Sequence, residues 1–278
     1  MITNAMTIDV EDYFQVEAFS DRIAPEDWEN YPLRVEIGCG RILELLDKHQ
    51  TKATFFVLGW LAQRRGRLVK SIAEAGHEIA SHGFSHRMIT RQSADEFRRD
   101  VRKSKHILED LTGRPVIGYR APTFSLVEDT KWAIDILSEE GFRYDSSIFP
   151  VRHDRYGIPD APRTIHETTG PGGETLLEFP PLTRRRWGRN IPFGGGGYLR
   201  LFPVNWFISA IQRFNGEGHP AMIYVHPWEL DPDHPILPGG PLKRWRHRVN
   251  LARTADKLDT LLSKLPFSTA AEVLRIDR

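Results

Sequence analysis

The stretch "KATFFVLGWLAQRRGRLVKSIAEAGHEIASHG", residues 52–83, contains the pattern that decides the fold. An apolar run over 52–60 is followed by an amphipathic segment over 67–76 and a second apolar run over 77–83. Apolar runs of this length are typical of buried strands, and the segment between them has helical spacing and ends at Gly76. The stretch therefore predicts a strand–helix–strand unit.

The same alternation continues on both sides of this unit. Strands are expected over 4–10, 116–122, 175–181 and 221–228, with a short segment over 142–147, and helices over 40–50, 93–113, 128–141, 204–215 and 250–265. The helix from Ser93 begins with Ser-x-x-Glu, the sequence of a capping box. Repeated units of this kind imply an α/β fold with a parallel sheet and helices outside it, and a closed barrel and an open doubly wound sheet both fit.

The segment over 150–174 interrupts the alternation of strands and helices. That segment is rich in Pro, Gly and polar residues, which predicts a long surface excursion. We interpret residues 1–278 as a single domain with an irregular insertion near 150–200. The only cysteine, Cys39, excludes an internal disulfide.

The charge pattern narrows the function classes. A net charge of +1 gives no global field that attracts nucleic acid or an anionic membrane, and the basic run "RRRWGR" at 184–189 is typical of a solvated loop. The first residues lack a secretory signal, and no apolar run approaches the roughly 20 residues of a membrane span. We therefore expect a cytoplasmic protein without a membrane span.

Unusual polar residues lie at or just beyond the carboxyl ends of the predicted strands: Asp9, His82, Arg120, Asp145 and His226. Both candidate architectures collect their ligands at that edge of the sheet. These residues are therefore expected to meet, although they are far apart in the sequence.

The segments "SHGFSH" and "TIDVED" offer metal ligands. His82 and His86 have a spacing that suits a divalent transition metal, although two ordinary histidines also fall at this spacing. Strand periodicity places Asp9 and Glu11 on one face, with Asp12 turned back at the strand end. Three acids packed together repel one another unless a cation is near, and the alternative is a solvated corner with a capping aspartate.

Two further segments offer groups for catalysis. Arg120 in "GYRAPTFS" could hold a carboxylate in place or form a surface pair. His226 follows the apolar strand "AMIYV" and suits a general acid or base, or a histidine bonded within the rim of the core.

Substrate contacts are expected from residues beside these segments. Aromatic rings stack on sugar faces or pack at a rim, and Arg200 could reach an acidic or hydroxyl-rich sugar. The aromatic candidates are Tyr198, Phe202, Trp187 and Trp228.

Taken in order, the acid cluster, the H-x-x-x-H pair, the R-x-P segment and the late strand ending in histidine resemble the polysaccharide deacetylase family. This family is also described as the NodB-homology or carbohydrate esterase family 4 deacetylases. The resemblance covers most of the chain, from Thr7 to Trp228, and "SHGFSH" and "VHPW" are its most specific pieces. "DVEDYF", "YDSSIFP" and "GGGGYLRLFP" look most like the branch encoded beside exosortase and exopolysaccharide gene clusters.

The resemblance implies a fold and residue roles. The fold is a distorted (β/α) barrel of the NodB-homology type, with fewer strands than the eight-stranded barrel. Asp9 matches the catalytic base, Arg120 the arginine that orients it, and His226 the catalytic acid. Asp145 lies near the aspartate that tunes this histidine.

The resemblance also implies a metal site with one departure from the family pattern. His82 and His86 match the metal histidines. The metal-binding acid normally follows the catalytic aspartate directly, but Val10 stands there, so Glu11 or Asp12 must supply the ligand, and periodicity favours Glu11.

The implied function is a hydrolase that uses a divalent metal, with zinc expected, to remove N-acetyl groups from a sugar of a polysaccharide, in exopolysaccharide biosynthesis. The implied partner is an N-acetylated polysaccharide or oligosaccharide. Two alternatives stay open. The D-x-E spacing also fits an allantoinase-like hydrolase of cyclic amides, and the fold could serve a non-catalytic carbohydrate-binding protein.

Overall fold

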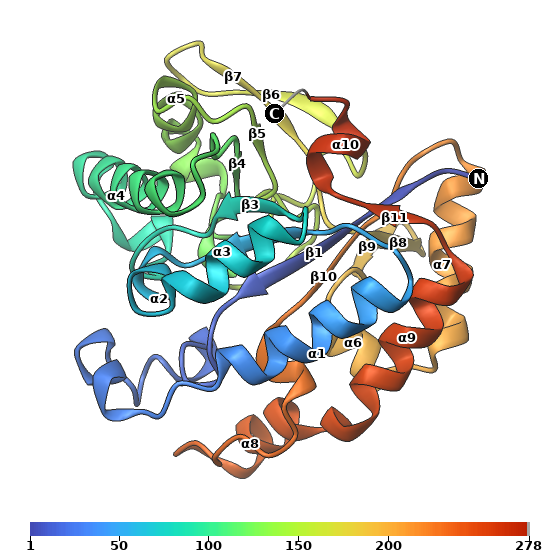
Figure 1. The fold of residues 1–278 in the computed structure, drawn as a ribbon. Coiled ribbons are helices and arrows are strands. Elements are labelled where there is room, and N and C mark those ends of the chain that lie inside the picture. The colour runs from blue at the N-terminus through green and yellow to red at the C-terminus, as the bar shows by residue number, and fades with distance from the viewer. Residues whose placement is uncertain (277–278) are drawn as a thin grey trace.

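The structure, a computed structural model, describes residues 1–276 and shows a curled, mostly parallel sheet (Figure 1). The last two residues of the predicted domain, 277–278, lie outside this range. The strand order of the main sheet is β10-β1-β2-β3-β4-β5-β7-β6, with β11 beside β1. Among the described pairs of this sheet, β6 and β7 are antiparallel and the others are parallel.

The strands of the main sheet are β1 (Asn4–Val10), β2 (Thr54–Val57), β3 (Glu78–Ser81), β4 (Gly118–Tyr119), β5 (Tyr144–Asp145), β6 (His166–Thr169), β7 (Thr175–Glu178), β10 (Met222–Val225) and β11 (Phe267–Ser268). A separate antiparallel hairpin consists of β8 (Thr183–Arg186) and β9 (Arg189–Pro192).

Helices surround the sheet, and Figure 1 shows α1 to α5 and α9 on its outer side. The α-helices are α1 (Val35–Lys48), α2 (Gly59–Arg64), α3 (Gly66–Glu74), α4 (Ala94–Thr112), α5 (Trp132–Glu139), α6 (Gly196–Leu201), α7 (Val204–Gly216), α8 (Pro241–Arg248), α9 (Thr254–Lys264) and α10 (Ala270–Leu274). Short 3₁₀ turns are η1 (Glu17–Phe19), η2 (Pro25–Asn30), η3 (Ile89–Arg91), η4 (Pro122–Phe124), η5 (Glu128–Thr130), η6 (Pro227–Leu230) and η7 (Leu251–Arg253). Within residues 1–276, no helix combines the length and the apolar character that crossing a membrane requires.

The two faces of β1 have different roles because successive side chains of a strand point to opposite sides. Met6, Ile8 and Val10 belong to the large apolar core that also includes helix side chains. The other face carries Thr7 and Asp9, whose side chains accept hydrogen bonds from Arg120. The parallel register pairs Ile8 with Val225 of β10, so the residues just beyond these two positions lie side by side at the carboxyl edge.

Several expected elements are present, and others differ for identifiable reasons. The capping box at Ser93 is confirmed: its side chain accepts from the backbone N–H of Glu96, and the Glu96 carboxylate accepts from the backbone of Ser93. Helix α1 begins at Val35 rather than 40 because the Asp12 carboxylate accepts the free N–H groups at its start. The segment over 150–174 is not wholly irregular, since it contains β6.

Candidate metal centre and active site

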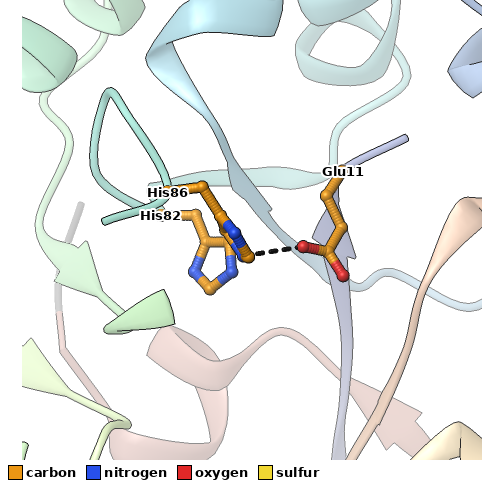
Figure 2. Close-up of side chains that lie close together, drawn as sticks. All are labelled: Glu11, His82 and His86. Atoms are coloured by element: carbon orange, nitrogen blue, oxygen red, sulfur yellow. Dashed lines mark ion pairs between the residues drawn. The ribbon is translucent and has the colours of Figure 1, made fainter. Parts of the chain in front are cut away.

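Glu11, His82 and His86 converge at the carboxyl edge of the sheet, as Figure 2 shows. One ligand atom from each lies within 4.8 Å of the others, and all three side chains are buried. Nε2 of His86 is 2.7 Å from Oε2 of Glu11. The structure thus brings together the two predicted histidines and the acid that strand periodicity favours.

Local structure presents these side chains in a form that can bind a cation. Nδ1 of His82 donates to the backbone carbonyl of Arg120 over 2.8 Å, which leaves Nε2 with its lone pair. Burial is the main cause that lowers the pKa of His82 to about 4, so this ring is neutral at physiological pH. The backbone of His86 has a φ of 53°, a left-handed conformation that is uncommon for residues other than glycine and is concentrated at functional sites.

Glu11 supplies the negative charge of this group. Burial raises the pKa of its carboxyl, but the electrostatic interactions with the neighbouring His86 and His226 outweigh burial and lower the pKa to about 2. Its Oε2 is buried and accepts no hydrogen bond of good geometry within residues 1–276. An imidazole with an available lone pair, a second imidazole and an ionised carboxylate form a donor set that suits zinc and related divalent ions. The metal implied by the family resemblance therefore fits these residues.

Asp12 does not belong to the donor set, which corrects its candidacy as a ligand. Its carboxylate oxygens accept from the backbone N–H groups of Tyr13, Arg34 and Val35 over 2.7–2.9 Å. Burial, opposed by these hydrogen bonds, raises the pKa of Asp12 to about 6. Asp12 is thus the capping aspartate that was the alternative interpretation of this corner.

Arg120 and Asp9 form an ion pair inside the sheet. Nη1 of Arg120 donates to Oδ1 of Asp9 over 2.6 Å and to Oγ1 of Thr7 over 2.9 Å. Nη2 donates to the hydroxyl of Ser146 over 2.9 Å, and the arginine side chain is fully buried. This network fixes the orientation of the Asp9 carboxylate.

His226 lies against the same acids. Its Nε2 is 3.3 Å from Oε1 of Glu11 and 4.0 Å from Oδ2 of Asp9. Burial lowers the pKa of His226, but the charges of Glu11 and Glu229 outweigh burial and raise the pKa to about 9. The imidazole is therefore a proton donor at physiological pH.

Glu229 is a residue of the site that the sequence analysis missed. Its Oε2 lies 3.1 Å from Nδ1 of His226, and its Oε1 accepts from Nε of Arg200 over 2.8 Å. The signal was available in the sequence: Glu229 is three residues after His226, at the position where a short turn returns a side chain.

Asp145 does not hold the position expected beside His226. It is buried, and its oxygens accept from the hydroxyl and the backbone N–H of Ser147. Burial raises the pKa of Asp145 and, more strongly, that of its neighbour Glu178. Among the described residues, Glu229 and not Asp145 contacts Nδ1 of His226.

The predicted substrate residues are placed differently from expectation. Arg200 is 4% exposed, and its guanidinium also donates to the carbonyls of Arg246, His247 and Val249, so it cannot reach a bound sugar. Trp228 is 7% exposed. Its ring stacks on that of His226, with centroids 5.4 Å apart, and so fixes the imidazole rather than offering an open face.

The remaining aromatic candidates are partly accessible. Tyr198 and Phe202 are half-buried and stack on each other, with ring centroids 6.3 Å apart, whereas Trp187 is 85% exposed on the β8–β9 hairpin. A cavity of about 450 Å³ adjoins the metal ligands at His86 and is lined in part by Gln15 and Arg87. It gives a molecule access to this end of the site.

Two protein families match adjacent parts of the chain. Residues 35–144 match the family described as polysaccharide deacetylase, and residues 146–275 match a domain of unknown function, DUF3473. Residues 35–144 are thus similar to the polysaccharide deacetylase family. Of the site residues, His82, His86 and Arg120 lie in the first matched region and His226 in the second.

Curated relatives agree with this similarity. The peptidoglycan deacetylase of Helicobacter pylori is 32% identical over 202 residues, which are 73% of this chain and 61% of the relative. The peptidoglycan-N-acetylglucosamine deacetylase of Bacillus cereus is 38% identical over 96 residues, 34% of this chain and 35% of the relative. The chain thus spans less than two thirds of these relatives.

Solved structures confirm the distorted (β/α) barrel of the NodB-homology type. A Mycobacterium smegmatis protein proposed to be a polysaccharide deacetylase superposes with a TM-score of 0.63 and 22% identity, over 98% of this chain and 88% of that one. An allantoinase superposes with the same TM-score of 0.63 and 19% identity, over 99% and 89% of the two chains. At these identities the likeness establishes the fold alone.

Proposed function

We propose that this protein is a metal-dependent hydrolase that removes N-acetyl groups from an amino sugar of a polysaccharide or its precursor. The observation that carries the proposal is the position of His226 and the Asp9–Arg120 pair directly beside Glu11, His82 and His86. A cation site next to one oriented carboxylate and one protonated imidazole has the groups that amide hydrolysis needs. The names of the curated relatives support an N-acetylated glycan as the substrate.

The donor set suits a divalent ion, and zinc is the ion we propose. When bound, the ion supplies Lewis-acid polarisation of the acetamide carbonyl and lowers the pKa of water. Asp9, held by Arg120, takes the proton of the attacking water through Oδ2, the oxygen that Arg120 leaves free. His226 gives its Nε2 proton to the departing amine, because an amine leaves readily only after protonation.

The second candidate function is hydrolysis of a cyclic amide. Its support is the Asp9-Val10-Glu11 spacing, with one residue between the aspartate and the acid that joins the metal group. The same catalytic groups serve both reactions, so the substrate decides between them.

We propose a role in exopolysaccharide synthesis on the resemblance of "YDSSIFP" and "GGGGYLRLFP" to the exosortase-associated branch.

The test is acetate release from N-acetylglucosamine oligomers by zinc-loaded protein, with allantoin hydrolysis measured in parallel. We expect acetate to appear with zinc, to stop after chelation, and to fall by roughly 10²–10⁴ in the Asp9→Asn variant. Hydrolysis of allantoin alone would replace the deacetylase proposal by the second candidate. Glycan binding without turnover at any metal loading would indicate a carbohydrate-binding protein instead.

A further inference from the structure

A groove with a volume of about 890 Å³ separates the β8–β9 hairpin from α7 and is distinct from the metal centre. Arginines dominate its lining, together with the aromatic side chains of Trp206 and Phe214. The relevant residues are Arg163, Arg184, Arg185, Arg186, Arg213 and Trp206. We call this feature the arginine groove.

Few acidic side chains lie at the arginine groove to neutralise its arginines. Glu217 is the one acidic residue that lines it, against five arginines. Within residues 1–276, no carboxylate forms an ion pair with the three consecutive arginines of β8 or with Arg213, whereas arginines elsewhere, such as Arg98 and Arg102, pair with glutamates. The whole chain has a net charge of only +1, so this positive charge is local to the groove.

The hairpin that carries these arginines is anchored to the body of the protein. Arg163 donates from Nε to the hydroxyl of Thr183 over 2.9 Å and from Nη2 to its carbonyl over 2.7 Å. Nδ2 of Asn190 donates to the carbonyl of Pro150 over 2.9 Å. The arginine groove therefore lies between the anchored β8–β9 hairpin and α7; Figure 1 shows where these elements lie in the fold.

Aromatic rings accompany the charges. Trp206 is 56% exposed where it lines the groove, and Trp187 is 85% exposed at the hairpin turn, with the Arg186 guanidinium 4.0 Å from its ring centroid. Exposed tryptophan rings can stack on the apolar faces of sugars, while guanidinium groups bind carboxylates and phosphates with two parallel hydrogen bonds.

We propose that the arginine groove binds an acidic glycan, a sugar chain that carries carboxylate or phosphate groups. The unpaired arginines match its charge and the tryptophans match its rings. The groove is concave, so a flexible chain can enter it, whereas the flat surface of a bilayer cannot. The choice of a glycan as the ligand rests on the proposed function. The inference extends that function, because it predicts that the polysaccharide has an acidic part that binds away from the metal centre.

The experiment is calorimetric titration of the full chain with oligogalacturonate, with neutral maltooligosaccharide as the control ligand. We expect binding of the acidic oligomer alone, weakening as salt is raised because salt screens exposed charges. The variant R184Q/R186Q/R213Q should lose roughly tenfold or more in affinity, since three charge-assisted contacts are removed. Trp206→Ala should weaken binding several-fold without a change of net charge.

The matched control removes three exposed cations elsewhere. R67Q/K70Q/R99Q changes side chains of α3 and α4, which lie away from α7 in Figure 1, and should bind as the unaltered protein does. Equal binding by the groove variant, or equal loss in the control variant, would overturn the inference.

Two parallel measurements separate the remaining outcomes. Binding to phosphatidylglycerol vesicles through the same arginines, without binding of oligogalacturonate, would also overturn the choice of a glycan. Acetate release by the groove variant from short neutral oligomers should be unchanged. If the unaltered protein releases no acetate, the proposed function is rejected. The titration with oligogalacturonate still tests whether the arginine groove binds an acidic glycan.

Discussion

The carboxylate of Glu229 lies 3.1 Å from Nδ1 of His226, on the side of the ring opposite the nitrogen that faces Glu11 and Asp9. This contact joins the imidazole to Arg200, whose guanidinium binds the other oxygen of Glu229. The buried arginine thus acts on His226 through an intervening carboxylate.

The Glu229→Gln variant should therefore change the pH profile of deacetylation. The charges of Glu11 and Glu229 outweigh burial and hold the pKa of His226 at about 9, and the proton donor is lost as pH rises through that value. Without the Glu229 charge the pKa falls, so activity should decline at a pH lower by roughly one unit on the alkaline side. The measurement is kcat/KM against pH, and an unchanged alkaline limb would contradict the role of Glu229.

Substitution of Gly196 should displace Glu229. A Cβ at this position would overlap the Glu229 carboxylate, whereas one at Gly197 would come no nearer than 4.0 Å to Arg200. Gly196→Ala should lower the free energy of unfolding by about 1–3 kcal/mol, the scale of overpacking in a filled interior. Gly197→Ala is the matched control, and equal denaturation midpoints for the two variants would show that this close approach is unimportant.

Removal of a metal ligand should be distinguishable from removal of the capping aspartate. His82→Ala and Glu11→Ala should bind zinc at least tenfold to a hundredfold more weakly, because each removes a donor from the group of three. Asp12→Asn should retain zinc and instead lower thermal stability, since its carboxylate satisfies N–H groups at the start of α1. Zinc titration and thermal melting of the three variants test which acid binds the metal and which caps α1. Loss of zinc binding in Asp12→Asn would contradict the assignment of Asp12 as the capping residue.

Arg120→Met should destabilise the protein strongly. It leaves the Asp9 carboxylate buried without its cation, a change that typically costs about 3–5 kcal/mol. The double variant Asp9→Asn, Arg120→Met should recover part of this loss, because no uncompensated charge remains. Chemical denaturation of the single and double variants gives the coupling energy, and simple additivity would argue against the pair.

Local sequence patterns predicted several strands of the sheet and several residues of the site. Apolar periodicity identified β1, β2, β3 and β10, and the carboxyl ends of those strands identified Asp9, His82 and His226 as residues that meet. These inferences succeed because a strand alternates its faces and parallel strands end at one edge of a sheet, so short stretches of sequence carry the information.

Only the tertiary structure decided the partners of the charged side chains. Asp12 and Glu11 are adjacent acids, yet one caps α1 and the other joins His82 and His86, because the backbone turns between them. Arg200 is turned inward onto Glu229 while the arginines of β8 remain without ion pairs among the described residues. Opposite charges attract each other however far apart they are in the sequence. Which carboxylate pairs with which cation therefore depends on how the whole chain packs and cannot be read from the spacing of the residues along the sequence.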